Sequence, residues 1–74
     1  MGPYTVRFNV PGKEGKIQCG DGQNVEFVGS TNMSFDGTVT CRIKADKKQG
    51  VVQLEKAATV TCSDNGTSLT CGGG

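Results

Sequence analysis

The chain has 74 residues, of which 34% are hydrophobic and four are cysteines. A chain of this length forms one domain with a small core, which usually needs cross-links or a metal to stay folded. Eight basic residues against seven acidic ones give a net charge of +1, without the excess of cations that nucleic-acid binding needs.

The first half of the chain is expected to contain four short strands. Apolar and polar side chains alternate over the first of them, which we expect to end at Pro11 because proline cannot continue a ladder. Gly20-Asp21-Gly22 is typical of a hairpin turn, and residues 29–32 are expected to form a loop. The strands are predicted at residues 4–10, 17–19, 25–27 and 33–35.

The clearest strand signal in the second half runs from Thr38 to Lys44, with Val39, Cys41 and Ile43 on one face. The polar run from Ala45 to Gly50 is expected to be a hairpin loop. Further strands are predicted at residues 51–54, 58–62 and 69–71. A helix over residues 51–58 is disfavoured, because the valines and threonines there favour strand.

Regular turns between short strands predict an all-β fold, a small antiparallel β-sandwich of about seven strands cross-linked by two disulfides. One domain is expected over residues 4–71. Residues 1–3 are interpreted as terminal residues outside it, and residues 72–74 as a glycine tail or linker. No segment approaches the roughly 20 apolar residues of a transmembrane helix, so we expect no direct insertion into a membrane.

Cys19, Cys41, Cys62 and Cys71 are even in number in a short chain, which is typical of disulfides formed in an oxidising compartment. Zinc is the competing interpretation, but the sequence has no C-x2-C pair and no histidine. Four cysteines allow three pairings. Because Cys62 and Cys71 flank a turn, the favoured pairing is Cys62 with Cys71 and Cys19 with Cys41. A further alternative leaves the four thiols free and buried.

Catalytic chemistry has few candidates. Without histidine, a Ser-His-Asp or Cys-His arrangement cannot form. Asp21, Asp36 and Asp64 lie at predicted turns, where aspartate bonds the backbone two residues on, although a calcium site or a catalytic carboxylate pair remains an alternative for them. We therefore predict no enzyme activity, no metal and no cofactor. Asn32 and Asn65 fit the N-glycosylation rule, and chance explains them equally well.

The candidate binding surface is the polar side of the strand at residues 38–44, if that strand lies at a sheet edge. Its members are Thr40, Arg42 and Lys44, and Tyr4 near the N-terminus is added as a half-exposed aromatic. The structural alternative assigns the cations to a solvated strand face and the tyrosine to the core.

The order of a first strand ending at Pro11-Gly12, a second reaching Gly20-Asp21-Gly22, and a strand at 37–44 answered by Gly50-Val51-Val52 resembles the small PEGA-type β-sandwich modules of bacterial surface and periplasmic proteins. The resemblance covers residues 4–54, and the four cysteines depart from the family pattern. It implies a non-enzymatic extracytoplasmic module that serves in envelope attachment or protein contact.

Three functions follow from these observations. The first is a structural or protein-interaction module of a larger cell-envelope or secreted protein, monomeric as an isolated domain, with a protein or an envelope polymer as its partner. The second is a small secreted inhibitor or toxin-like effector. The third is a carbohydrate-binding module. The expected location is the periplasm, the cell surface or the medium.

Overall fold

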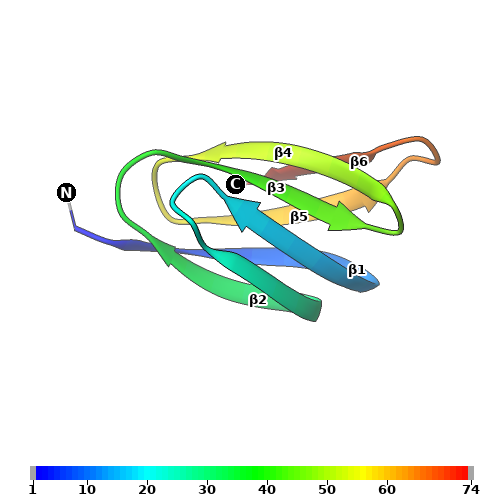
Figure 1. Cartoon of the computed structure of the whole chain (residues 1–74), viewed down its shortest axis with the longest axis horizontal. Helices are drawn as coiled ribbons and strands as arrows, with labels where there is room; N and C mark the ends of the chain where they lie inside the picture. Colours follow the sequence, from blue (N-terminus) through cyan, green and yellow to red (C-terminus); the bar gives the residue numbers. More distant parts are fainter. Residues whose placement is uncertain (1, 74) are drawn as a thin grey trace.

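The computed structural model describes residues 2–73, and these form six β-strands without a helix. The strands are β1 (Tyr4–Cys19), β2 (Asn24–Phe35), β3 (Val39–Ala45), β4 (Lys48–Leu54), β5 (Ala58–Asp64) and β6 (Leu69–Gly73). They form one sheet in the order β4-β3-β1-β5-β6, with β2 paired to β1, and the sheet curls until it is nearly closed (Figure 1). The all-β prediction is confirmed, but the predicted sandwich of seven strands is wrong in its strand number and in its separate sheets.

β1 is a strand of 16 residues that takes part in both halves of the sheet. Residues 6–9 pair with β5 in parallel, and residues 16–19 pair with β3 in the antiparallel sense. The predicted strand end at Pro11 is wrong, because the chain stays extended there. The pairing with β2 is interrupted between Asn9 and Glu14, where β1 also leaves β5 and has not yet reached β3. Pro11 has no N–H to donate, so it fits the part of the strand where that ladder is interrupted.

β2 pairs with β1 along both halves of β1, so the two strands form a bent two-stranded ribbon (Figure 1). The predicted loop at residues 29–32 is wrong, since these residues lie inside β2. Gly29 has a φ of 78°, which lets the strand change direction without steric strain. Two pairs of predicted strands thus merge into β1 and β2, so the eight ranges given by the sequence become six strands.

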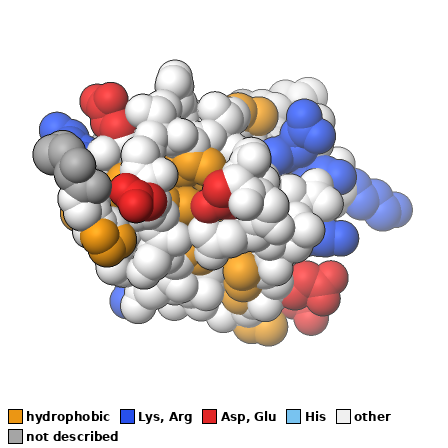
Figure 2. All heavy atoms as spheres, turned by 60° about the vertical axis from the view of Figure 1, so that its left-hand side comes forward, with side chains coloured by type: hydrophobic (Ala, Val, Ile, Leu, Met, Phe, Trp, Pro, Cys, Tyr) orange, Lys and Arg blue, Asp and Glu red, His pale blue; other side chains and the backbone are white. Residues whose placement is uncertain are grey.

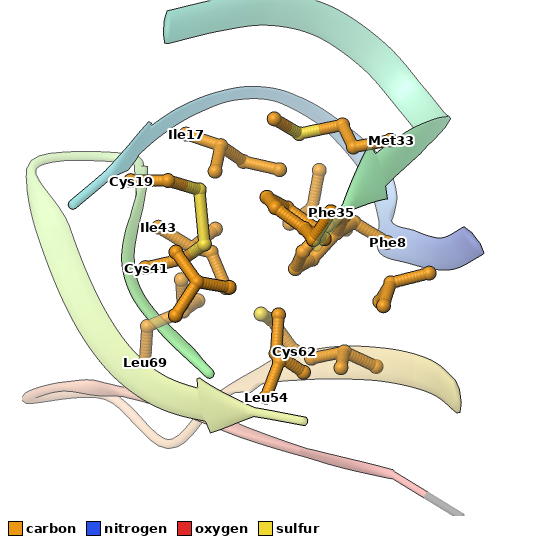
Figure 3. Close-up of a cluster of buried hydrophobic side chains, with 14 of the residues drawn as sticks. Phe8, Ile17, Cys19, Met33, Phe35, Cys41, Ile43, Leu54, Cys62 and Leu69 are labelled. Atoms are coloured by element: carbon orange, nitrogen blue, oxygen red, sulfur yellow. A yellow bond between two sulfur atoms is a disulfide. The ribbon is translucent and has the colours of Figure 1, made fainter. Parts of the chain in front are cut away.

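The β3–β4 and β5–β6 hairpins lie next to each other around the core, with β4 beside β6 (Figures 1 and 3). The predicted loop over residues 45–50 is a turn of only Asp46 and Lys47, both with positive φ. β4 approaches β6 without ladder pairing between them. A Cβ atom on Gly50 would lie 2.6 Å from the carbonyl oxygen of Leu69, so this close approach requires glycine.

The core consists of the inward side chains of the alternating strands, as predicted. Phe8, Ile17 and Ile43 are almost fully buried, and the ring of Phe8 meets that of Phe35 edge to face (Figure 3). The described residues contain no helix long and apolar enough to cross a membrane.

Both disulfides join residues that lie directly opposite each other on antiparallel strands, which confirms the favoured pairing. Cys19 and Cys41 connect β1 to β3 with their Cα atoms 4.1 Å apart, and Cys62 and Cys71 connect β5 to β6 at 4.0 Å. The first disulfide lies within the core (Figure 3). Two disulfides in so small a domain indicate an oxidising, extracytoplasmic environment.

The C-terminal glycines extend the domain beyond the predicted boundary. Gly72 and Gly73, expected in a tail, pair with Thr61 and Val60 as part of β6. Gly2 and Pro3 precede β1, as expected for terminal residues. Met1 and Gly74, included in the predicted termini, lie outside the described residues.

Candidate functional site

The outward face of β3 lies at the middle of a four-stranded surface made by β2, β1, β3 and β4. The pairing registers place Gln18 opposite Arg42, and Val51 opposite Arg42 on its other side. In the next row, Lys44 lies between Lys16 and Gln49. β3 is therefore an inner strand and not the sheet edge on which the predicted mode of binding depended.

Three cations cluster at the centre of this surface, which we call the cation face and define by Lys16, Arg42 and Lys44. Residues directly opposite on paired strands project to the same side of the sheet, as do residues two apart on one strand. The three side chains are exposed, and none takes part in an ion pair among the described residues. Figure 2 shows most of the visible basic side chains gathered on one side of the molecule.

The neighbours of the cation face are mostly neutral. Gln18, Thr40, Gln49 and Gln53 offer amide or hydroxyl groups, and Val51 is 58% exposed. A large apolar side chain this exposed beside a cation is the kind of contact that protein interfaces bury. Sequence analysis selected Thr40, Arg42 and Lys44 but missed Lys16, because only the pairing register brings Lys16 to them.

Lys16 and Lys44 face each other directly, which costs stability. Like charges in this position on antiparallel strands are destabilising, by about 0.2–1 kcal/mol. A carboxylate or amide at either position would avoid the cost. Glu26, which lies opposite Lys16 on β2, offsets part of this cost.

A shallow hollow of about 550 Å³ borders the cation face toward the β3–β4 turn. Its charged lining consists of Lys16, Lys44 and Lys47 together with Glu14 and Glu26. Its apolar lining comes from Phe27 and Val28. The hollow thus combines charge of both signs with an apolar surface.

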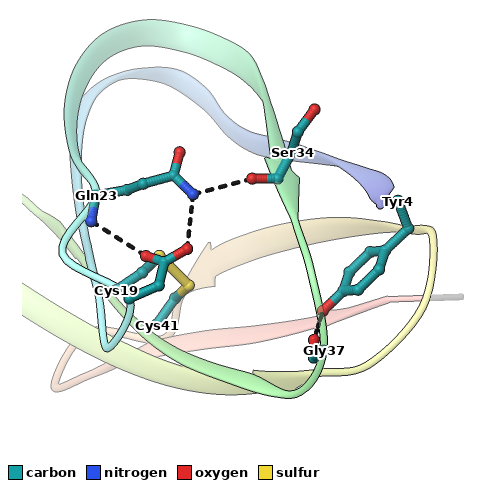
Figure 4. The surroundings of a disulfide bond; sticks show 7 residues. Tyr4, Cys19, Gln23, Ser34, Gly37 and Cys41 are labelled. Atoms are coloured by element: carbon teal, nitrogen blue, oxygen red, sulfur yellow. Dashed lines mark hydrogen bonds between the residues drawn. A yellow bond between two sulfur atoms is a disulfide. The ribbon is translucent and has the colours of Figure 1, made fainter. Parts of the chain in front are cut away.

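Tyr4 does not belong to the cation face. Its ring packs against Phe35, with centroids 6.0 Å apart, and its hydroxyl donates to the carbonyl oxygen of Gly37 at 2.6 Å (Figure 4). Burial raises the pKa of the Tyr4 phenol, and the nearby carboxylate of Glu55 adds to the shift. A hollow of about 570 Å³ adjoins the ring, between Thr38 and Ala57. The residues of the predicted binding surface thus lie in two separate places, with Tyr4 apart from Thr40, Arg42 and Lys44.

Two of the three turn aspartates form the bonds expected of them. Asp21 accepts from the backbone N–H of Gln23 at 3.1 Å, and Asp64 accepts from that of Gly66 at 2.8 Å. Gln23 also lowers the pKa of Asp21 through a side-chain hydrogen bond (Figure 4). No bond of this kind is found for Asp36 among residues 2–73. In the same part of the chain, no three acidic or sulfur side chains form a group that could hold a metal.

A second set of charges is internally paired and connects three elements at the end of the molecule opposite Tyr4. The Lys13 ammonium contacts the Asp46 carboxylate and lies 3.6 Å from Asp64, while Lys48 donates to Asp64 at 2.9 Å. Hydrogen bonds from Lys13 and Lys48 lower the pKa values of Asp46 and Asp64, respectively. These charges join the bend of β1, the β3–β4 turn and the end of β5, which is a structural role.

Comparison with known proteins adds no relative: no protein-family model, curated sequence or solved structure matches the chain. The resemblance to PEGA-type modules stays a prediction. The functional argument therefore depends on the chain's own residues.

Proposed function

We propose that this chain is a non-catalytic protein-interaction module of a larger cell-envelope or secreted protein, and that its cation face binds an acidic surface of a partner protein. The observation that carries the proposal is the cluster of Lys16, Arg42 and Lys44, which has no ion-pair partner among the described residues and includes two lysines directly opposed. An acidic partner would relieve that repulsion on binding.

The shape of the face supports a protein partner. Its cations project from adjacent positions of a sheet, with Val51 exposed beside Arg42. Burying an apolar side chain next to a charge-assisted hydrogen bond is typical of protein interfaces. The periplasm or the cell surface is a setting that fits the two disulfides.

The residues also support a role without catalysis. The sequence has no histidine, the commonest general base. Asp21 and Asp64 are engaged in turns, and Asp46 is paired with Lys13. These carboxylates act in the architecture of the domain.

The test is titration of the isotope-labelled chain with a glutamate-rich peptide, followed by NMR. We expect amide shifts at Lys16, Arg42 and Lys44, and binding that weakens as salt increases. The double variant Arg42→Glu/Lys44→Glu is expected to bind roughly tenfold more weakly, since two charge pairs become repulsive. Its thermal stability is expected not to fall, because Glu at position 44 faces Lys16.

The matched control is Lys47→Glu/Lys56→Glu, which changes the net charge equally at cations outside the cation face. This control is expected to retain most of the binding. Equal affinities of the two double variants would contradict the proposal. Binding to an acidic polysaccharide but not to the glutamate peptide would assign the face to an envelope polymer instead.

A further inference from the structure

The outer edge of β2 is unpaired along its N-terminal half. The backbone N–H of Cys19 donates to the carbonyl of Gln23, and in this register Ile17 and Gly15 pair with Val25 and Phe27. Since hydrogen-bonding groups alternate between the two edges of a strand, those of Asn24, Glu26 and Val28 point away from β1. No hydrogen bond to the backbone of these three residues is found within residues 2–73.

This edge lacks the usual protection against strand pairing. Natural edge strands commonly carry lysine or proline, and β2 has neither of them and no arginine. Val28 is 75% exposed, the most exposed large hydrophobic side chain of the described residues. The edge therefore offers free backbone groups beside an apolar side chain.

The open segment is short and has defined ends. Gly29, with its φ of 78°, bends the strand after Val28. Beyond the bend, Gln23 Nε2 donates to the carbonyl oxygen of Ser34 at 2.9 Å (Figure 4), so this carbonyl group is already occupied by a side chain. Residues 24–28 form the straight part of the strand that a partner can reach.

A second copy of the chain fits this segment poorly. Antiparallel pairing of residues 24–28 with themselves over their full length would place Glu26 directly opposite Glu26 of the other copy. Like charges in that position are destabilising. Registers that avoid this contact use fewer of the outward backbone groups. The single charge of the segment thus disfavours self-pairing.

A strand with a cation at its centre fits better. Glu26 would face that cation directly, and Glu14, which lies opposite Val28 on β1, adds negative charge on the same face. No ion pair joins Glu26 to Lys16 among the described residues, although the two are opposite on β2 and β1. The carboxylate of Glu26 is therefore available to a partner.

We propose that residues 24–28 of β2 accept an antiparallel β-strand from another protein, with lysine or arginine opposite Glu26 and an apolar residue opposite Val28. Backbone hydrogen bonds would provide most of the affinity and the two side-chain contacts the register. This site adjoins the cation face, since Glu26 lies opposite Lys16, but it does not depend on the function proposed for that face.

The test uses a short blocked peptide in which valine, lysine and asparagine alternate with threonine, so that lysine lies opposite Glu26 in the antiparallel register. In NMR titration of the whole chain, we expect shifts and slower amide exchange at Asn24, Glu26 and Val28. A peptide that is N-methylated at the residues bonding to β2 is expected to lose binding. N-methylation at the alternate residues is expected to have little effect, because those N–H groups point away.

The charge contact is tested with Glu26→Gln, against Glu55→Gln as a matched control away from β2. Glu26→Gln is expected to lower the affinity for the lysine peptide by roughly two- to fivefold, which corresponds to the free energy of one cross-strand charge pair. The glutamine replaces an exposed side chain with one of similar shape, so the fold should persist. The Arg42→Glu/Lys44→Glu variant should still bind this peptide.

Three results would overturn the inference. The first is equal binding of the two N-methylated peptides, and the second is a set of shifts that avoids residues 24–28. The third is a dimer of the unmodified chain with protected amides at these residues, which would assign the edge to self-assembly. If the chain does not bind the glutamate peptide at the cation face but still binds the lysine peptide at β2, the function proposed for the cation face fails and this inference stands.

Discussion

The β3–β4 and β5–β6 hairpins are similarly built but present different surfaces. We refer to them as the β3–β4 layer and the β5–β6 layer of the curled sheet. Cys19–Cys41 links the first layer to β1, and Cys62–Cys71 links the two strands of the second. β3 directs Arg42 and Lys44 outward beside Lys16, whereas the outward residues of β5 and β6 are neutral. Those neutral residues are Thr59, Thr61, Ser63 and Thr70.

The difference shows which residues the fold requires. Strand alternation accounts for the inward side chains of both layers, but outward positions accept any residue of suitable β-propensity. Threonine and serine on the β5–β6 layer suit a strand. The charge concentrated on the other layer is the basis of our proposal that this layer contacts a partner.

The largest expected effect comes from removing the disulfides one at a time. Replacing Cys19 and Cys41 with alanine is expected to lower the free energy of unfolding by about 3–5 kcal/mol, because it opens a longer loop and leaves space in the core. Replacing Cys62 and Cys71 is expected to cost about 2–3 kcal/mol, since that loop is short and Cys71 is half-buried. Urea unfolding measures both, and an equal or reversed order would contradict this distinction between the layers.

The next effect concerns the contact that joins the two layers. Gly50→Ala is expected to cost about 1–3 kcal/mol, because its Cβ would press on the rigid backbone of Leu69 and on the sulfur of Cys71. Gly15→Ala is the matched control. There the added Cβ would meet the ring of Phe27, also at 2.6 Å, and a half-buried ring can turn away. Thermal unfolding should show the smaller loss for Gly15→Ala, and the opposite order would mean that β4 can move from β6 at little cost.

The smallest effect is the pH dependence of the charges that connect the layers at the turn end. The pKa values of Asp46 and Asp64 are lowered in the folded chain, so both bind protons less readily than in the unfolded chain. Their stabilising contribution is therefore present above their ordinary pKa of 3.8 and is lost as the pH falls through the lowered values. Unfolding measured across this range should show a shallower acid loss for Asp64→Asn than for the unmodified chain, and salt should reduce the difference.

Short-range patterns were sufficient for the inward residues and the disulfides. Alternation over residues 38–44 placed Cys41 in the core, and the turn between Cys62 and Cys71 predicted their pairing. The bend of β1 was missed because proline followed by glycine usually ends a strand. Here the pairing of β1 with β5 and then with β3 keeps the chain extended on both sides of Pro11.

The candidate site was only partly predictable, for the same reason. Arg42 and Lys44 stand out locally, but Lys16 joins them through a register between residues far apart in the chain. The free edge belongs to β2 and not to β3, because strand order in a sheet is set by long-range pairing. The turn within residues 45–50 was predicted, but not that it would be as short as Asp46 and Lys47, since lysine rarely adopts a φ of 64°.

The Cys19–Cys41 disulfide closes a loop that contains all of β2. Both ends of this exposed strand are thereby bound to the same molecule. Exchange of β2 between two copies, the usual hazard for a peripheral strand, would require the bond to break first. While the Cys19–Cys41 bond remains oxidised, β2 can pair with an added strand, but β2 itself cannot be exchanged into another copy of the chain.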